Sequence, residues 1–431
     1  MTSPLTTTVI ILLTVFIVAN VLANYLPENS DFFGELQART IGKGLQKRTS
    51  TTSTVTPALT TSVTTMTSTT TTTITTTITT TTATVPGRLH ADGQWIKDSQ
   101  GNVAILRGPA LWWRWNYPDY SKQYDPLAYP EETEKKYDAI KSMGNNFIRV
   151  QLNKWTWDNG PKYVSAVDTL VQWAAQRNMW VVLDFQIYAQ MNDGYPTWTK
   201  RDQMNYILNG TMQQFMMTLA QRYKNQPNVI GFEIMPEKPN DVTWASYRNI
   251  TTTQARAEYR QGLISAIRAI HSVDSSYLVF VYPSSNDRLI SFIQEAPIIE
   301  PNIVWVQMRS VTWDNMYWKY ATDYYNGNQA AAYPEMESTY QKVLFAAQNI
   351  TGAPKYPVML LETEATTSLP NPTQYVTDLL NIFAKHQVGI SWWSADIQPS
   401  TTEEVWIFFF NDSNYNLTPL GQAWKQKLLA T

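Results

Sequence analysis

Eight short apolar segments alternate with amphipathic segments between residues 88 and 431, and this alternation constrains the fold more than any other feature. The apolar segments are NVAIL, NNFIRVQL, MWVVLDF, NVIGFEI, YLVFVY, NIVWVQM, YPVMLLE and VGISWW. Segments between them, such as 164–178 and 253–274, repeat apolar residues at helical spacing. Nearly continuous apolar strands separated by helices predict a parallel sheet covered on both faces. We therefore predict an α/β fold, a (β/α)8 TIM barrel over residues 88–431, with an open doubly wound sheet as the alternative.

Residues 89–108, which include the first apolar segment, predict a small hairpin around the turn-prone 97–101.

The first 87 residues have a different composition. Residues 9–23 form one apolar run, which predicts a signal peptide or signal anchor over residues 1–24. Residues 25–87 are rich in Thr and Ser and predict a disordered linker, because such a composition buries too little apolar surface to fold. Asn-x-Ser/Thr triplets follow at Asn209, Asn249, Asn349, Asn411 and Asn416. Together these features predict an extracellular or cell-surface glycoprotein that meets the membrane only through its N-terminal segment.

Composition excludes several classes of function. The chain carries 33 Lys+Arg against 35 Asp+Glu, a formal net charge of −2, so no basic field would attract nucleic acid. It has no cysteine and three histidines, His90, His271 and His386, which lie far apart in sequence and give no metal-ligand spacing. No GxSxG elbow and no phosphate-binding GxxxxGK[ST] loop occurs. We expect a monomeric catalytic body without metal or cofactor.

Candidate functional residues follow from the predicted barrel, since chemistry in this fold lies where the strands end. The residues at or just after predicted strand ends are Arg149, Asp184, Gln186, Glu237, Met308, Arg309, Glu362, Trp392 and Trp393. Only one of the adjacent Trp392 and Trp393 can point inward, because side chains alternate along a strand. Trp112 and Trp113 cluster with Trp115, Trp155 and Trp157 after the first two strands, at the same rim.

The order of the motifs ILRG, NNFIRV, GFEIMPE, VMLLE, SWW and LTPLGQAWKQKL resembles glycoside hydrolase family 5, the cellulase-like enzymes, from about Leu89 to Leu429. The resemblance implies retaining hydrolysis of a β-linked polysaccharide, with Glu237 as acid/base and Glu362 as nucleophile. Retention needs one protonated and one ionised carboxyl group ~5 Å apart. Glu364 is a minor alternative nucleophile, and Glu233, inside its strand, is expected to support the site.

The resemblance also implies binding roles. Arg149 matches an arginine that hydrogen-bonds the nucleophile, and Gln186 stands where the family has a histidine. Trp392 or Trp393 would form the platform for a sugar ring, and Trp112 and Trp113 are expected to line the cleft. The chain departs from the family at Pro236, where an asparagine is usual, and at 308–310, where a His-x-Tyr is usual.

These observations predict an endo-acting hydrolase of β-1,4-linked polysaccharide, cellulose or β-glucan, without a cofactor. A β-mannanase is the alternative that keeps the chemistry. The departures motivate a second alternative, a catalytically impaired polysaccharide-binding glycoprotein. An unrelated barrel enzyme, such as an isomerase or aldolase, is the third, although no Schiff-base lysine stands at a predicted strand end.

Overall fold

A computed structural model of the chain describes residues 87–116, 120–186, 190–192, 195–197, 200–234, 240–283, 289–308, 328–365, 369, 371–397 and 408–430. The predicted signal segment, most of the predicted linker and Glu237 lie outside the described residues.

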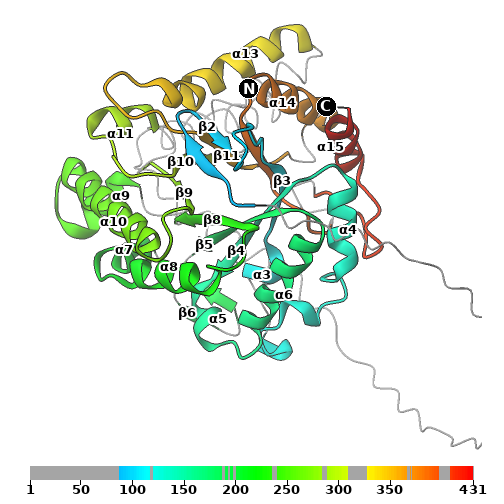
Figure 1. Cartoon of the computed structure of the whole chain (residues 1–431), viewed down its shortest axis with the longest axis horizontal. Helices are drawn as coiled ribbons and strands as arrows, with labels where there is room; N and C mark the ends of the chain where they lie inside the picture. Colours follow the sequence, from blue (N-terminus) through cyan, green and yellow to red (C-terminus); the bar gives the residue numbers. More distant parts are fainter. Residues whose placement is uncertain are drawn as a thin grey trace, which may run out of the picture. The chain divides into compact units, whose positions relative to one another are not determined.

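Eight parallel strands close into a barrel, surrounded by helices (Figure 1). In barrel order they are β3 (Arg107–Leu111), β4 (Phe147–Asn153), β5 (Trp180–Gln186), β8 (Val229–Ile234), β9 (Leu278–Val281), β10 (Ile303–Met308), β11 (Val358–Thr363) and β12 (Gly389–Trp392). β12 then pairs with β3 and completes the ring. The predicted (β/α)8 barrel is confirmed, and the open-sheet alternative is wrong because the first and last strands are hydrogen-bonded to each other.

The first strand differs from the prediction. It runs from Arg107 to Leu111 instead of over NVAIL, residues 102–106. Gly108 and Pro109 argue against a strand in the sequence pattern. In the barrel Gly108 is needed, since a Cβ at that position would lie 1.7 Å from the Phe147 carbonyl oxygen of the neighbouring strand.

The longer helices pack around the barrel (Figure 1). They are α4 (Glu134–Ser142), α6 (Tyr163–Gln176), α8 (Thr211–Arg222), α10 (Thr252–Val273), α13 (Gln329–Val343), α14 (Pro372–Lys385) and α15 (Pro419–Leu429). Shorter ones are α3 (Trp113–Asn116), α5 (Lys154–Asn159), α7 (Lys200–Leu208), α9 (Asp241–Arg248), α11 (Leu289–Glu295) and the 3-10 turns Tyr120–Lys122, Pro126–Ala128 and Phe345–Asn349. The helices predicted over 164–178 and 253–274 are α6 and α10. No described helix combines the length and apolarity that a membrane crossing requires.

Local side chains set where helices begin. The Thr251 hydroxyl accepts a hydrogen bond from the Gln254 backbone N–H, and the Gln254 side chain accepts one from the Thr251 backbone, so α10 starts at Thr252 with a capping box. At α15, Thr418 caps the helix and Pro419 occupies its first turn. These caps satisfy backbone donors that would otherwise remain unpaired.

Two short hairpins lie outside the barrel sheet. β1 (His90–Asp92) pairs with β2 (Trp95–Lys97), and β6 (Gln190–Asn192) pairs with β7 (Tyr195–Thr197). The chain turns first at Gly93, which has a positive φ of 58° and joins β1 to β2, and it turns again within the predicted 97–101 segment. At this second turn Lys97 pairs with Val103 in an antiparallel bridge, and the Asp98 and Ala104 N–H groups donate to the Asn102 and Ile96 carbonyl oxygens at 2.9 and 2.8 Å.

Side chains alternate between the barrel interior and the layer under the helices. On β4, Ile148, Val150 and Leu152 pack outward in the large core, whereas Phe147 faces inward. The inward apolar cluster comprises Leu89, Ile96, Leu106, Phe147, Val182, Ile230, Leu278, Phe280, Tyr282, Val304, Val306, Met359 and Leu361. Burying each large aliphatic side chain contributes ~1.5–3 kcal/mol. The lower part of the barrel is thus a packed apolar core.

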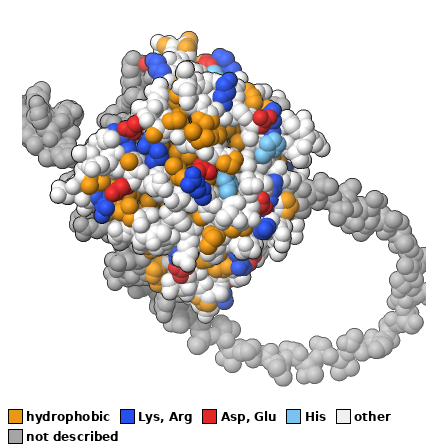
Figure 2. Space-filling model, turned by 60° about the vertical axis from the view of Figure 1, so that its left-hand side comes forward, with side chains coloured by type: hydrophobic (Ala, Val, Ile, Leu, Met, Phe, Trp, Pro, Cys, Tyr) orange, Lys and Arg blue, Asp and Glu red, His pale blue; other side chains and the backbone are white. Residues whose placement is uncertain are grey.

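The surface carries charges of both signs. On the face shown in Figure 2, basic and acidic side chains are interspersed among apolar and neutral ones. This view shows no broad patch of a single sign, in keeping with the formal net charge of −2.

Candidate active site

A buried arginine joins three carboxyl groups near the carboxyl ends of four strands. Arg149 donates from Nε and Nη2 to both oxygens of Glu233, at 2.6 and 2.9 Å. Its Nη2 also donates to Asp184 Oδ2 at 2.9 Å. Its Nη1 donates to Glu362 Oε2 at 2.6 Å. All three nitrogens of the guanidinium therefore donate to carboxylates. Lysine could not reproduce this fixed geometry.

Strand register places these side chains at one level. Asp184 and Glu233 are direct neighbours on β5 and β8, and both face into the barrel beside Arg149 of β4. Glu362 reaches the same point because β11 is irregular: its register shifts against β10 after Gln307 and against β12 between Leu360 and Thr363. Leu361 also faces the interior, so the irregularity aims two successive side chains inward.

The four residues differ in their access to solvent. The side chains of Arg149, Asp184 and Glu233 are completely buried, whereas 15% of the Glu362 side chain is exposed. Glu362 is therefore the member of this cluster that a molecule entering from solvent can reach. Burial lowers the pKa of Arg149, but Glu233, Asp184 and Glu362 outweigh this effect and hold its pKa well above the ordinary value. The guanidinium thus remains charged and favours the ionised form of Glu362.

The cluster contains more acid than base. One guanidinium faces three carboxyl groups. Burial raises the pKa of Glu233, against the lowering effects of Arg149 and of the Tyr282 hydroxyl. The pKa values of Arg149 and Glu233 are therefore both raised: the carboxyl groups keep the guanidinium protonated, and burial makes Glu233 easier to protonate than an exposed glutamate.

The two predicted platform tryptophans point to opposite sides of β12. Trp393 packs against Trp112, with ring centroids 4.7 Å apart, in a small cluster with Ala110 and Phe408. Trp392 faces outward and packs against Phe409 and Trp424. Trp392 is fully buried in that layer, so its predicted role in substrate binding is wrong. Trp393 and Trp112 retain 8% and 5% exposure at the rim.

Other predicted residues are placed only in part. Glu237 lies outside the described residues. Gln186 ends β5 and Trp113 begins α3, but the positions of their side chains are not described, so their predicted roles stay predictions. Glu364 is 96% buried, since its exposure is 4%. Within the described residues, no group of three or more His, Cys, Asp or Glu side chains is arranged to hold a metal ion.

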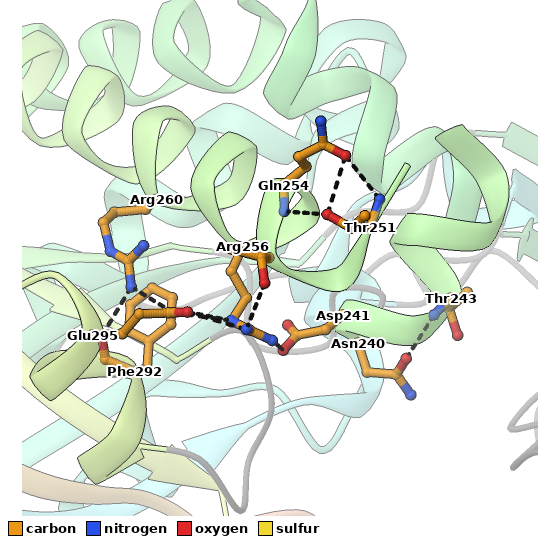
Figure 3. Close-up of polar contacts among 10 residues, drawn as sticks. Asn240, Asp241, Thr243, Thr251, Gln254, Arg256, Arg260, Phe292 and Glu295 are labelled. Carbon is orange, nitrogen blue, oxygen red and sulfur yellow. Dashed lines mark hydrogen bonds and ion pairs between the residues drawn. The ribbon is translucent and has the colours of Figure 1, made fainter. Parts of the chain in front are cut away.

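Contacts among α9, α10 and α11 position the residues that follow Glu237 in the sequence, beginning at Asn240. Asn240 caps α9 by accepting from the Thr243 backbone N–H at 2.8 Å. Arg256 of α10 then bridges Asp241, at 3.1 Å, and Glu295, at 2.9 Å (Figure 3). These contacts fix where residue 240 lies after the segment that begins at the end of β8.

Two polar groups were not predicted. The Tyr282 hydroxyl lies beside the carboxylate cluster; strand alternation along YLVFVY, which places residues 278, 280 and 282 on one face, is the signal that identifies it. A second buried ion pair joins Lys136 to Glu132 at 2.6 Å and to Asp396 at 3.5 Å. Ser394 donates to Asp396 at 2.5 Å, so this pair anchors the chain directly after Trp393.

Residues 98–398 match the family model described as cellulase (glycosyl hydrolase family 5). The chain belongs to glycosyl hydrolase family 5. This matches the resemblance drawn from its motifs and makes it a member of a family of glycosidases.

Individual relatives of this family 5 chain are distant. An endoglucanase of Paenibacillus polymyxa is 25% identical over 215 residues, which cover 46% of this chain and 50% of that relative, so the match spans half of the relative's length. A β-glucanase of Saccharophagus degradans, crystallised with cellotetraose, has a TM-score of 0.57 at 18% identity, covering 80% of this chain and 94% of the other. The catalytic domain of an endoglucanase from Xanthomonas campestris has a TM-score of 0.55 at 12% identity, covering 80% and 100%. These structures share the fold.

Proposed function

We propose that this chain is a retaining, endo-acting glycosidase that cleaves β-1,4-linked glucan, with Glu362 as nucleophile and Glu237 as acid/base. The observation that carries the proposal is the 2.6 Å bond from buried Arg149 to Glu362, the carboxylate of the cluster that solvent reaches. A guanidinium in that position keeps a carboxylate ionised and aligned for attack. The glucan substrate is supported by relatives described as endoglucanase and as β-glucanase with cellotetraose.

The proposed reaction has two steps. Glu362 attacks the anomeric carbon while Glu237 gives a proton to the leaving oxygen, forming a glycosyl ester and a free sugar end. Glu237 then removes a proton from water, which attacks the same carbon and releases Glu362, so the configuration is retained. Ester formation removes the negative charge of Glu362 and leaves Arg149 facing Glu233 and Asp184. Arg149 therefore remains paired throughout the reaction.

The tryptophan pair supports binding of a sugar chain. Trp393 and Trp112 pack against each other at the end of β12, with their ring planes tilted by 43°, and an aromatic face at this position can pack against the C–H face of a pyranose ring. We further propose that residues 1–24 target the chain to the membrane and that residues 25–87 link the catalytic body to it. These assignments make the protein extracellular or attached to the cell surface.

Hydrolysis by the full chain tests the assignment. Reducing-sugar release is measured from carboxymethyl cellulose, barley β-glucan and mannan with wild type, Glu362→Gln, Glu237→Gln and Glu364→Gln. We expect Glu362→Gln to lose at least about 1000-fold in kcat. Glu237→Gln should lose ~100-fold or more on polysaccharides, yet retain formation of the glycosyl ester with an activated aryl glycoside that needs no proton.

Glu364→Gln is the matched control, because it makes the same change two residues away. Loss of activity in Glu364→Gln with a fully active Glu362→Gln would reverse the nucleophile assignment. Preferred hydrolysis of mannan would select the β-mannanase alternative. Binding of glucan without hydrolysis by the wild type would favour the polysaccharide-binding alternative, which Pro236 motivates because it stands where the family carries asparagine.

A further inference from the structure

Tyr282 lies just beyond the carboxyl end of β9 and has no role in the proposed reaction. It directly follows β9 and faces inward, continuing the alternation of Leu278 and Phe280. Its side chain is fully buried. The Tyr259 hydroxyl donates to the Tyr282 backbone oxygen at 3.2 Å, so the main chain at this position is fixed by α10. Glu233 of β8 pairs with Phe280 of β9, so Tyr282 lies on the same inward side of the sheet, two residues beyond the partner of that glutamate.

The groups that face this hydroxyl are those of the carboxylate cluster. Burial raises the pKa of Tyr282 well above its ordinary value; Glu233, Glu362 and Asp184 add to that effect and Arg149 opposes it. Within the described residues the hydroxyl has no hydrogen bond of ordinary geometry, yet it is close enough to Glu233 to lower the pKa of that carboxyl. Leaving a buried hydroxyl unpaired is unfavourable, so a small adjustment that completes the bond to Glu233 is favoured.

A neutral donor suits this environment. The cluster has one cation for three carboxyl groups, and a hydrogen bond from a phenol stabilises an ionised carboxylate without changing the number of charges. The raised pKa of Tyr282 keeps its proton in place over the working range of a hydrolase. Glu233 in turn accepts a bidentate pair of hydrogen bonds from Arg149, which fixes the plane of the guanidinium.

We propose that Tyr282 is a positioning residue: its O–H donates to Glu233, which fixes Arg149 and thereby holds Nη1 of Arg149 on Glu362. This inference rests on the proposed function, in which Glu362 is the nucleophile. Tyr282 itself touches neither the substrate nor the reacting atoms. Its contribution reaches Glu362 through two hydrogen-bonded neighbours.

The test compares Tyr282→Phe with Tyr277→Phe in the full chain. Both substitutions remove one hydroxyl from a buried tyrosine at an end of the same strand; the Tyr277 hydroxyl donates to the Ala220 backbone oxygen, outside the barrel interior. We expect Tyr282→Phe to lower kcat about tenfold with KM nearly unchanged. The acidic limb of its kcat/KM profile should move to higher pH, because loss of the donor favours protonation of the cluster. Tyr277→Phe should lower thermal stability and leave both kinetic features as in wild type.

A double-mutant cycle separates positioning from independent effects. If Tyr282 acts through Glu233, Tyr282→Phe should cost much less in a Glu233→Gln background than in wild type. Additive losses, or an unchanged kcat and acidic limb in Tyr282→Phe, would overturn the inference while leaving the Glu362→Gln result intact. Full activity in Glu362→Gln would instead remove the proposed function itself. Circular dichroism of each variant shows whether the fold is kept, and failure of Tyr282→Phe to fold would also count against the inference, since it would show a structural role.

Discussion

Glu362 shows how a single residue acquires a chemical role from its backbone. On a regular strand, Leu361 facing the interior would place Glu362 under the helices. The irregular pairing of β11 with both neighbours turns Glu362 inward as well, onto Arg149. This carboxylate thereby gains a charged partner and partial contact with solvent, and both support the nucleophilic role proposed for it.

The adjacent tryptophans allow a prediction at the same scale. Trp392→Ala should destabilise the fold by ~3–5 kcal/mol, because it removes a fully buried ring packed on Phe409 and Trp424. Trp393→Ala should mainly weaken binding of cello-oligosaccharides, by about tenfold or more, since Trp393 packs beside Trp112 and keeps 8% exposure. Thermal unfolding and titration with cellotetraose measure the two effects. Equal losses of binding in both variants, with the fold intact, would contradict this division.

At the scale of secondary-structure elements, ion pairs join neighbouring helices, and their contribution to folding stability depends on pH. Glu337 of α13 accepts from Lys385, at the end of α14, and from His386, each at 2.7 Å. His386 also stacks on Phe345 of the turn after α13, with centroids 4.2 Å apart. The hydrogen bonds from Lys385 and His386 hold the pKa of Glu337 below its ordinary value of 4.5. This carboxylate therefore links two neighbouring helices on the outside of the barrel.

The sign of the resulting pH dependence follows from linkage. A depressed pKa in the folded state means that Glu337 contributes stability above its unfolded pKa of about 4.5, and that this contribution is lost as pH falls through the lower folded value. Glu337→Gln should therefore cost ~0.5–1 kcal/mol at pH 6 and almost nothing at pH 3. Urea unfolding at both pH values measures it, with Lys385→Gln as the variant that removes one donor. A cost that persists at pH 3 would show that packing, not charge, is responsible.

At the scale of the whole molecule, the catalytic body and the N-terminal 87 residues are predicted to be independent. A Thr/Ser-rich segment buries little apolar surface and so has little to add to the stability of a barrel with its own core. Residues 88–431 should unfold in one cooperative transition with a Tm within ~2 °C of the full chain. Scanning calorimetry of both forms checks this. A Tm lower by more than ~5 °C would show that the N-terminal region packs on the body.

The amino-acid sequence by itself determined the architecture of the body. The length and apolarity of the strand segments and the helical spacing between them depend on neighbours in the chain, so seven of the eight predicted strands coincide with barrel strands. β3 was misplaced because Gly108 and Pro109 carry no strand signal, and the need for a glycine arises from the neighbouring Phe147. Glu362 was identified from the sequence because it lies near the end of its strand, and Arg149, which lies inside β4, was identified because its motif resembles that of the family.

The tertiary structure alone decided which side chains meet. Closure of the barrel brings Arg149, Asp184, Glu233 and Glu362 together although they come from four strands. Irregular pairing of β11 orients Glu362, and packing against α15 turns Trp392 away from the site. The buried Lys136–Glu132 pair reads in sequence as an ordinary exposed helix pair. The reason is physical: burial and through-space contact depend on the closed sheet, whereas periodicity depends on the local chain.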